Sequence, residues 1–188
     1  MELYLNFNPF PRIETPRLNL RELTMDDLDD FYFFRTNEQV LRYIDREPMS
    51  HKEEAASFIQ RIIDQVKNNE TIIWVIELKD MPGKMIGTIT FWRVEKENLR
   101  AEIGYMIHPD HWNRGIASEA IGAVVDFGFK VMNLHSIEAN INPANEGSRK
   151  VLLRSGFTKE AYFRENFYFR GKFIDSEIYS LLNPCHKN

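Results

Sequence analysis

Residues 102–120 read EIGYMIHPDHWNRGIASEA and join three local signals in one stretch. The first part is rich in β-branched and aromatic residues, which predicts a strand over 100–108 that Pro109 ends. From about Gly115 apolar residues recur at helical spacing, which predicts a helix. The positions on its apolar face are Ala117, Ile121, Val124, Val125, Gly128 and Met132. The stretch therefore predicts a strand, a turn and a helix in that order.

The turn before the helix has the composition of an anion-binding turn. Asn113 and Gly115 tolerate left-handed backbone angles, so consecutive N–H groups can point inward at the start of the helix. The unpaired N–H groups of the first helical turn, the helix dipole and Arg114 all favour an anion there. Small side chains at Ala117 and Ser118 let a phosphate approach the backbone. An ordinary turn is the commoner meaning of such a pattern, so both interpretations stay open from these residues alone.

Two well-known phosphate-binding motifs are excluded because the residues they require are absent here. The P-loop requires Lys and then Ser or Thr after its last glycine, whereas Ile116, Ala117 and Ser118 follow Gly115 here. The dinucleotide-binding fingerprint requires three glycines at fixed spacing, and this turn has one.

The chain before this stretch predicts further helices and strands. Thr24 has the features of a helix N-cap, with acids in the next turn, and the helix runs to about Thr36. Ser50-His51-Lys52-Glu53 has the capping-box pattern, which predicts a helix ending near Asn68. The alternating or β-branched runs predict strands over 17–23, 71–78 and 84–93, the last two forming an antiparallel meander with 100–108.

The chain after this stretch predicts another strand, a helix and a terminal hairpin. Gly156 is expected to end the helix, and Arg170-Gly171 to form the hairpin turn. The ranges are 136–142 for the strand, 145–155 for the helix, and 157–169 and 173–181 for the hairpin. We find no repeat or linker, so the sequence predicts one mixed α/β (α+β) domain over residues 1–188.

The amino-acid composition argues against several kinds of binding partner. Of the 188 residues, 24 are Lys or Arg and 28 are Asp or Glu, and the net charge of −4 argues against a nucleic-acid partner. The single cysteine, Cys185, excludes a disulfide framework or a thiolate metal cluster within the chain. His108 and His111 flank Pro109, which favours a turn over a metal pair, so we expect no metal site. Without a long apolar run or a leader pattern, we expect no membrane partner and a cytoplasmic location.

The turn resembles the acetyl-CoA pyrophosphate loop of the GNAT superfamily of N-acetyltransferases. The family pattern is Gln or Arg, two free positions, Gly, one free position, then Gly or Ala, and it falls on Trp112, Gly115 and Ala117. Trp therefore replaces the polar first position. A Trp there, followed by Ser-Glu-Ala over 118–120, is similar to the RimJ/RimL branch, which acetylates protein N-termini and assorted small amines. Asn113 is a departure, because that branch commonly has Gly at this position.

Other segments resemble the same branch and cover most of the chain. They are Glu-Thr-Pro-Arg-Leu over 14–18, Glu-Ile-Gly-Tyr over 102–105, the Asn-x-x-Ser helix start at 145–148 with Gly-Phe at 156–157, and the hairpin over 171–182. The resemblance implies a GNAT-type fold with flanking helices and a central, largely antiparallel sheet of six to seven strands.

The resemblance also implies the chemistry and its residues. An acetyl group would pass directly from acetyl-CoA to a neutral primary amine, without a covalent enzyme intermediate. The main chain at Tyr105, Met106 and Ile107 would bind the pantetheine arm and polarise the thioester carbonyl, and Asn145 would add a side-chain hydrogen bond. The pyrophosphate would rest on Asn113, Arg114, Gly115, Ile116, Ala117 and Ser118.

Two residues are candidates for proton transfer. Glu102 shares a strand face with Gly104 and Met106, which leaves room for an amine beside it, and it would accept the amine's proton. The alternative for Glu102 is an ion pair or a solvent contact. Many family members have a Tyr where this chain has Leu152, so Ser148 is the candidate proton donor to the leaving thiolate. The alternative for Ser148 is a local hydrogen bond within its helix.

The acceptor and two other functions stay open. A protein N-terminus, a free amino acid, a polyamine or an aminoglycoside-like amine all fit, and the chain would act as a monomer or homodimer. Asp29, Asp30, Asp45 and Glu47 either attract a cation or form a solvated face. Because Leu152 replaces the usual Tyr, a non-catalytic acyl-CoA sensor is an alternative. The aromatic residues of the last hairpin suggest an RNA-binding sheet, but Lys172 follows Arg170-Gly171 where that motif needs an aromatic residue. These aromatics are Tyr162, Phe163, Phe167, Tyr168, Phe169, Phe173 and Tyr179, for which core, hairpin wall or dimer contact is the favoured interpretation.

Overall fold

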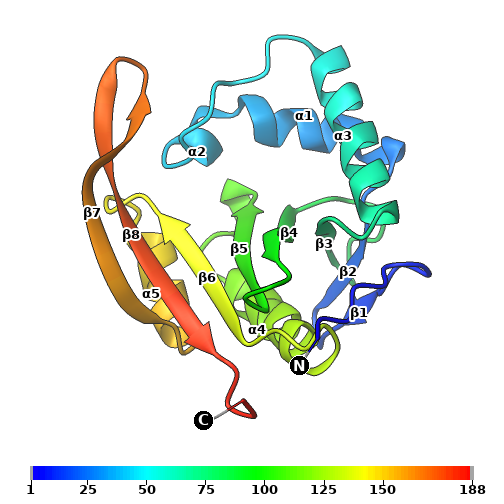
Figure 1. Ribbon diagram of the computed structural model, residues 1–188. Helices are drawn as coiled ribbons and strands as arrows, with labels where there is room; N and C mark the ends of the chain where they lie inside the picture. The colour runs from blue at the N-terminus through cyan, green and yellow to red at the C-terminus, as the bar shows by residue number, and fades with distance from the viewer. Residues whose placement is uncertain (1, 187–188) are drawn as a thin grey trace.

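A central sheet organises residues 2–186, the part of the chain that the computed structural model describes (Figure 1). Within these residues the sheet has eight strands in the order β1-β2-β3-β4-β5-β6-β8-β7. Every pairing is antiparallel except that of β5 with β6. The strands are β1 (Ile13–Glu14), β2 (Leu18–Glu22), β3 (Ile72–Leu78), β4 (Gly87–Glu95), β5 (Arg100–Ile107), β6 (Ser136–Ile141), β7 (Thr158–Phe169) and β8 (Lys172–Leu182).

Short and long helices connect these strands. The α-helices are α1 (Leu28–Thr36), α2 (Glu38–Leu41), α3 (Lys52–Lys67), α4 (Ile116–Lys130) and α5 (Glu146–Arg154). Two 3-10 turns are η1 (Met25–Asp27) and η2 (Pro109–His111). The predicted mixed α/β class, the largely antiparallel sheet and the β3-β4-β5 meander are confirmed. The sheet has one strand more than the six to seven expected, because the two-residue β1 extends its edge.

Two local predictions, for the starts of β4 and α3, needed correction. The strand expected from residue 84 begins at Gly87, and the backbone N–H of Met85 instead donates to Asp30 of α1. The capping box expected at Ser50 is wrong, because α3 begins at Lys52 with His51 as its N-cap. The N–H of Ser50 donates to Glu54 at 3.4 Å, one residue beyond the expected partner.

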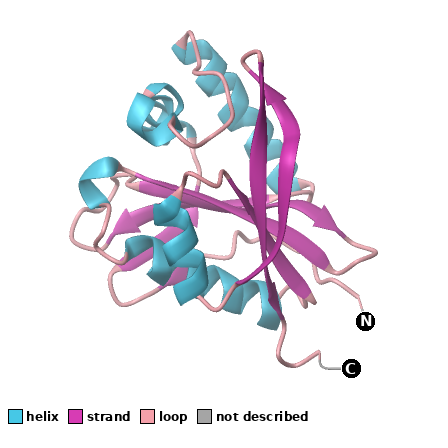
Figure 2. Ribbon diagram, turned by 90° about the vertical axis from the view of Figure 1, so that its left-hand side faces the viewer, coloured by secondary structure: helices cyan, strands magenta, loops and turns pink. Residues whose placement is uncertain are grey.

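The helices lie on both faces of the sheet (Figures 1 and 2). Trp74 of β3 packs edge-on against Phe127 of α4, with ring centres 5.4 Å apart. Its neighbour Ile73 points to the opposite face and lines a small cavity with Ile62 and Val66 of α3. Since neighbouring strand residues point to opposite faces, α4 and α3 cover different sides of the sheet. The hydrophobic core therefore has two layers, one between the sheet and α4 and one between the sheet and α3.

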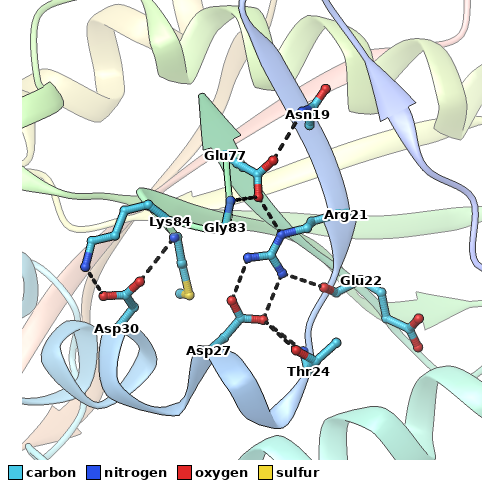
Figure 3. Close-up of polar contacts among 10 residues, drawn as sticks. Asn19, Arg21, Glu22, Thr24, Asp27, Asp30, Glu77, Gly83 and Lys84 are labelled. Carbon is cyan, nitrogen blue, oxygen red and sulfur yellow. Dashed lines mark hydrogen bonds and ion pairs between the residues drawn. The ribbon is translucent and has the colours of Figure 1, made fainter. Parts of the chain in front are cut away.

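A buried ionic network fixes the start of α1 to the sheet (Figure 3). The guanidinium of Arg21 on β2 donates to Glu77 of β3 at 2.9 Å and to Asp27 of η1 at 2.7 Å. Asp27 also accepts the N–H of Thr24 at 2.9 Å. Thr24 is thus the N-cap of the 3-10 turn η1 and not of α1 as predicted, because α1 begins only at Leu28, with Asp27 as its N-cap. Both carboxylates are buried, and loss of Arg21 would leave them as uncompensated buried charges. The network thus links the turn η1, which precedes α1, to β2 and β3.

We predict opposite effects for two glycines of α4. A Cβ added at Gly128 would lie 2.9 Å from the Phe91 ring, whereas one at Gly122 would meet nothing within 4 Å. Gly128→Ala should lower the free energy of unfolding by about 1–3 kcal/mol through overpacking. Gly122→Ala should raise it by about 0.5–1 kcal/mol, because alanine loses less entropy in a helix. Urea unfolding of both variants measures this, and an unchanged Gly128→Ala protein would contradict the close packing.

Candidate active site

The sheet opens between its two central strands. β5 pairs with β6 only from Arg100 to Glu102, opposite Ser136 to Glu138. β5 continues along β4 as far as Ile107, whereas β6 continues along β8, so the two strands separate (Figure 1). One edge of β5 beyond Glu102 therefore faces an opening rather than a neighbouring strand.

The strand register decides which backbone groups face this opening. The N–H of His108 donates to the carbonyl of Ile86 at 2.8 Å. Because hydrogen-bonded pairs alternate along an antiparallel ladder, Met106 directs its backbone groups to β4, and Tyr105 and Ile107 direct theirs to the opening. The Ile107 carbonyl accepts the indole N–H of Trp112 at 2.7 Å. The N–H and carbonyl of Tyr105 and the N–H of Ile107 remain directed at the opening.

The turn after β5 has the left-handed geometry that its residues predict. The φ angles are 58° at Asn113 and 75° at Gly115, which is the N-cap of α4. The first helical backbone bond joins the N–H of Glu119 to the carbonyl of Gly115 at 3.0 Å. The N–H groups of residues 116–118 precede that bond, so they have no partner within the helix. The start of α4 thus presents backbone donors and the positive end of its dipole.

A distant segment holds this turn in place. Arg17 donates to the carbonyl of Arg114 at 2.9 Å and to the carboxylate of Glu119 at 2.6 Å. The hydroxyl of Thr15 donates to the same carboxylate at 2.6 Å. Burial opposes ionisation of Glu119, but the hydrogen bonds from Thr15 and Arg17 lower its pKa below the usual value. Sequence reasoning included Thr15, Arg17 and Glu119 in family-like segments but gave none of them a role, and their contact fixes the carbonyl side of the turn.

Glu102 lies buried at the point where the strands separate. Its side chain is among the buried charged groups, 7% exposed, with Trp92 and Glu138 as strand neighbours. Burial raises the pKa of Glu102 above its usual value, although Arg93, 3.4 Å away, opposes the shift. The space expected beside Gly104 is bounded by Trp92, whose ring lies 3.7 Å from where a Cβ would stand.

Ser148 and Tyr105 form a hydroxyl pair on the other face of β5. Their oxygens are 2.6 Å apart, and burial raises the pKa of Tyr105 to about 12. Asn145 accepts the N–H of Ser148 at 3.0 Å through its side-chain oxygen, which caps α5 and leaves its amide N–H₂ available. The structure thus places Ser148 against the Tyr105 side chain of β5, with Asn145 at the start of the same helix, and it places Glu102 on the opposite face of β5 from Ser148. Sequence reasoning used only the main chain of Tyr105, although strand alternation already placed its side chain opposite Glu102.

Several other candidate residues are engaged elsewhere. His108 accepts the N–H of Asp110 at 3.2 Å and stacks on Phe33. Within residues 2–186 no group of three or more His, Cys, Asp or Glu is arranged to hold a metal ion. No helix of that part of the chain is long and apolar enough to cross a membrane.

Three of the four acids considered for binding the acceptor amine form ion pairs, namely Asp29 with Lys52, Asp30 with Lys84 and Glu47 with Arg170. In the last hairpin Tyr179 is buried, whereas Tyr162, Phe163, Phe167, Tyr168 and Phe173 are exposed.

Comparison with known families agrees with this geometry. The acetyltransferase (GNAT) domain family matches residues 17–158, which include the opening and the turn. The chain belongs to the GNAT acetyltransferase family. It is therefore an acyltransferase of the N-acetyltransferase class that uses acetyl-CoA.

Individual relatives span nearly the whole chain. The uncharacterized N-acetyltransferase YoaA of Bacillus subtilis is 39% identical over 93% of this chain and 98% of its own length. The ribosomal-protein-S5-alanine acetyltransferase structure from Vibrio fischeri is 25% identical, with a TM-score of 0.82 over 95% of this chain and 100% of that one. The spermidine N-acetyltransferase structure from Vibrio cholerae, solved with CoA and spermine, has a TM-score of 0.80 over 90% of this chain and 97% of that one. At 23% identity it shows a shared fold alone.

We predict that Gly115→Val weakens acetyl-CoA binding by at least about 10-fold, because valine resists the left-handed angle that this turn needs. Gly83→Val is the matched control, since Gly83 has a φ of 81° in a distant loop where an added Cβ meets nothing within 4 Å. Calorimetric titration with acetyl-CoA compares the two. Equal affinities of the two variants for acetyl-CoA would show that the turn at 113–118 does not bind acetyl-CoA.

Proposed function

We propose that this GNAT enzyme binds acetyl-CoA along the opening between β5 and β6 and transfers the acetyl group directly to a primary amine. The observation that carries the proposal is the separation of the strands after Glu102, which aims the backbone of Tyr105 and Ile107 at the opening. The turn at 113–118 follows β5 after the short 3-10 turn η2. A donor with amides in its arm and a diphosphate at its end matches this sequence of backbone groups.

The pantetheine arm is proposed to add to β5 as a short strand would. The N–H and carbonyl of Tyr105 and the N–H of Ile107 would bind its amides, and Asn145 would donate from the α5 side. Met106 was also expected here, but its backbone pairs with Thr88, so its part is limited to lining the site. The diphosphate would rest on the backbone N–H groups of 113–118 and on the Arg114 side chain.

Holding both reactants in attack geometry is proposed to supply most of the catalysis. A backbone N–H of β5 beside the thioester carbonyl would stabilise the negative charge that develops on its oxygen. The amine must lose a proton before or during attack, and Glu102 is the proposed acceptor. Its burial suits this role, because the raised pKa makes Glu102 a stronger base than an exposed glutamate.

We predict that Glu102→Gln lowers kcat by about 10²-fold or more near neutral pH. Glu102 accepts a proton only when ionised, and its raised pKa means that wild-type activity rises with pH through a range above that of an ordinary glutamate. The variant should lose that limb of the pH profile. Glu95→Gln, at the end of β4, is the control. A Glu102→Gln enzyme with the wild-type profile would remove Glu102 from this role.

The departing thiolate is proposed to receive its proton from the Ser148–Tyr105 pair. Neither hydroxyl ionises near neutral pH, so each retains a proton to donate, and at 2.6 Å they act as one hydrogen-bonded unit. This pair would take the place of the tyrosine that is absent at Leu152.

We predict that Ser148→Ala and Tyr105→Phe each lower kcat by about 10-fold or more, and that the double variant loses little beyond either single change. An acyl donor with a more acidic thiol should restore part of the rate, because its thiolate leaves without a proton. Steady-state rates with two such donors test this. Equal losses with both donors would assign the pair a structural role only.

The acceptor is proposed at the level of its class. The relatives include a protein named for alanine acetylation of ribosomal protein S5 and one named for spermidine acetylation. We infer a primary amine, either a protein N-terminus, as in the RimJ/RimL-like branch, or a small molecule. A cytoplasmic location and a monomeric or homodimeric state stay predictions.

An acceptor screen tests the function as a whole. Purified protein, acetyl-CoA and a thiol reagent are mixed with peptides starting with Ala or Ser, spermidine, free amino acids and an aminoglycoside. CoA release should depend on at least one amine and fall in the Gly115→Val variant. Tight acetyl-CoA binding with no amine-dependent release would instead support a sensor.

A further inference from the structure

One cation of the chain lies against both a buried carboxylate and an indole ring. The cation is the guanidinium of Arg93, whose central carbon lies 4.6 Å from the ring centre of Trp92. The Nη1 atom of the same guanidinium lies 3.4 Å from Oε2 of Glu102. Trp92 and Glu102 are cross-strand partners on β4 and β5, so their side chains leave the sheet on the same side. The two residues therefore contact one and the same cation.

This resident cation is exposed and weakly held. The side chain of Arg93 is 62% exposed, whereas Glu102 is buried. Arg93 has a φ of 47° and lies where the register of β4 with β5 shifts, between Trp92 and Glu95. An ion pair with one exposed partner at this distance stabilises a fold little, so the guanidinium can move into solvent at a small free-energy cost.

Glu102 differs from Arg93 because it cannot move into solvent. Burial raises the pKa of Glu102, and the charges of Arg93 and Arg100 both oppose this shift. The guanidinium of Arg100, however, pairs with Glu138 across β5 and β6. An ionised, buried carboxylate is unfavourable without a counter-charge. Loss of the Arg93 contact would therefore favour the entry of another cation beside Glu102.

Gly104 brings this site next to the strand that is proposed to bind the donor. A Cβ added at Gly104 would lie 3.7 Å from Nε1 and 3.9 Å from Cδ1 of Trp92, so this edge of the ring lies beside the glycine. Gly104 directly precedes Tyr105, whose backbone is directed at the opening between β5 and β6. Trp92 is 38% exposed, so part of its ring is accessible from solvent.

We propose that the protonated amine of the acceptor takes the place of the Arg93 guanidinium between Trp92 and Glu102. The amine needs no separate cavity, because it occupies the volume that the guanidinium leaves. Trp92 is then a specificity-determining residue, since an indole face attracts an ammonium group but gains little from a neutral one. This assignment rests on the proposed function, in that the acceptor is an amine.

The same exchange accounts for release of the product. On transfer the ammonium gives up two protons, one to Glu102 and one that balances the departing thiolate. An N–C bond forms and the C–S bond of the thioester breaks, so the product is a neutral amide. A neutral amide has no charge for the indole face or the carboxylate to hold, and Arg93 returns to its position.

NMR of the indole N–H groups tests cation binding without catalysis. The chain has three tryptophans, and Trp92→Phe identifies the Trp92 signal by its loss. CoA without an acetyl group fills the donor site, so no transfer occurs. Butylammonium chloride, compared with sodium chloride of equal ionic strength, should shift the Trp92 signal to saturation at mildly alkaline pH. Butanol has the same carbon chain without the charge and should shift the signal little.

Variants matched in charge identify the resident cation. Arg93→Gln should lower the dissociation constant of butylammonium by about 3-fold or more, because the competing guanidinium is gone. Lys96→Gln removes the same charge from an exposed position in the turn after β4 and should change the constant by less than about 2-fold. The proposal is overturned by the absence of a saturable shift in the wild type, by an equal shift with butanol, or by equal constants in the two variants.

Steady-state kinetics applies the same test to the amine that releases CoA fastest in the acceptor screen. Trp92→Leu should raise KM for that amine by about 5-fold or more, and by more than it lowers kcat, with KM for acetyl-CoA unchanged. Trp92→Phe keeps an aromatic face and should lie closer to the wild type. An unchanged amine KM in Trp92→Leu would remove Trp92 from acceptor binding. If no amine releases CoA, it is the proposed function that fails, whereas the NMR titration decides the cation site separately.

Discussion

The separation of β6 from β5 is the constraint on which the rest of the site depends. Arg100 pairs with Glu138 across the two strands and holds them together at their start. Beyond that point β5 follows β4 and β6 follows β8, so the sheet divides into two parts. Exposed strand edges leave backbone N–H and carbonyl groups that need partners, and an extended, amide-bearing ligand can provide them. The opening is thus a consequence of strand pairing, and it requires no loop rearrangement.

Strand alternation then separates the two groups that are proposed to transfer protons. Glu102 lies on one face of β5, and the Tyr105 hydroxyl reaches Ser148 on the other. In the proposed reaction the amine loses a proton on the side of Glu102, while the thiolate gains one on the side of α5. A base and an acid kept apart by a strand do not neutralise each other, and each keeps the pKa that its own surroundings set. Burial acts on both groups, and it favours a basic Glu102 and a protonated Tyr105.

Local features were predictable from the sequence, and contacts between distant residues were not. The left-handed angles at Asn113 and Gly115 depend on residue type and immediate neighbours, so the turn and the start of α4 were predicted correctly. The contact of Arg17 with Glu119 joins residues 102 positions apart, and no spacing rule within one element reports it. The position of β8 between β6 and β7 has the same origin, because strand order is set by packing of the whole sheet. The N-cap of α3 was misplaced by one residue, at Ser50 instead of His51, because neighbouring residues fit the same capping pattern. In the structure the N–H of Ser50 donates to Glu54 rather than to Glu53.

The departures from the family pattern keep the required physical chemistry with different side chains. Trp112 replaces a polar residue, but its indole N–H donates to the Ile107 carbonyl and links the end of β5 to the turn. Asn113 replaces glycine and still adopts a φ of 58°, an angle that asparagine tolerates better than most residues. Leu152 is buried and apolar, so it offers no hydroxyl. Ser148, one turn earlier on α5, has a hydroxyl and pairs it with the hydroxyl of Tyr105. Each position needs only a chemical property: an N–H donor at 112, a left-handed backbone at 113 and a hydroxyl near the end of β5. Several residue types have each of these properties. Matching by chemical group and position therefore explains how the turn keeps its left-handed geometry although Trp112 and Asn113 differ from the family pattern.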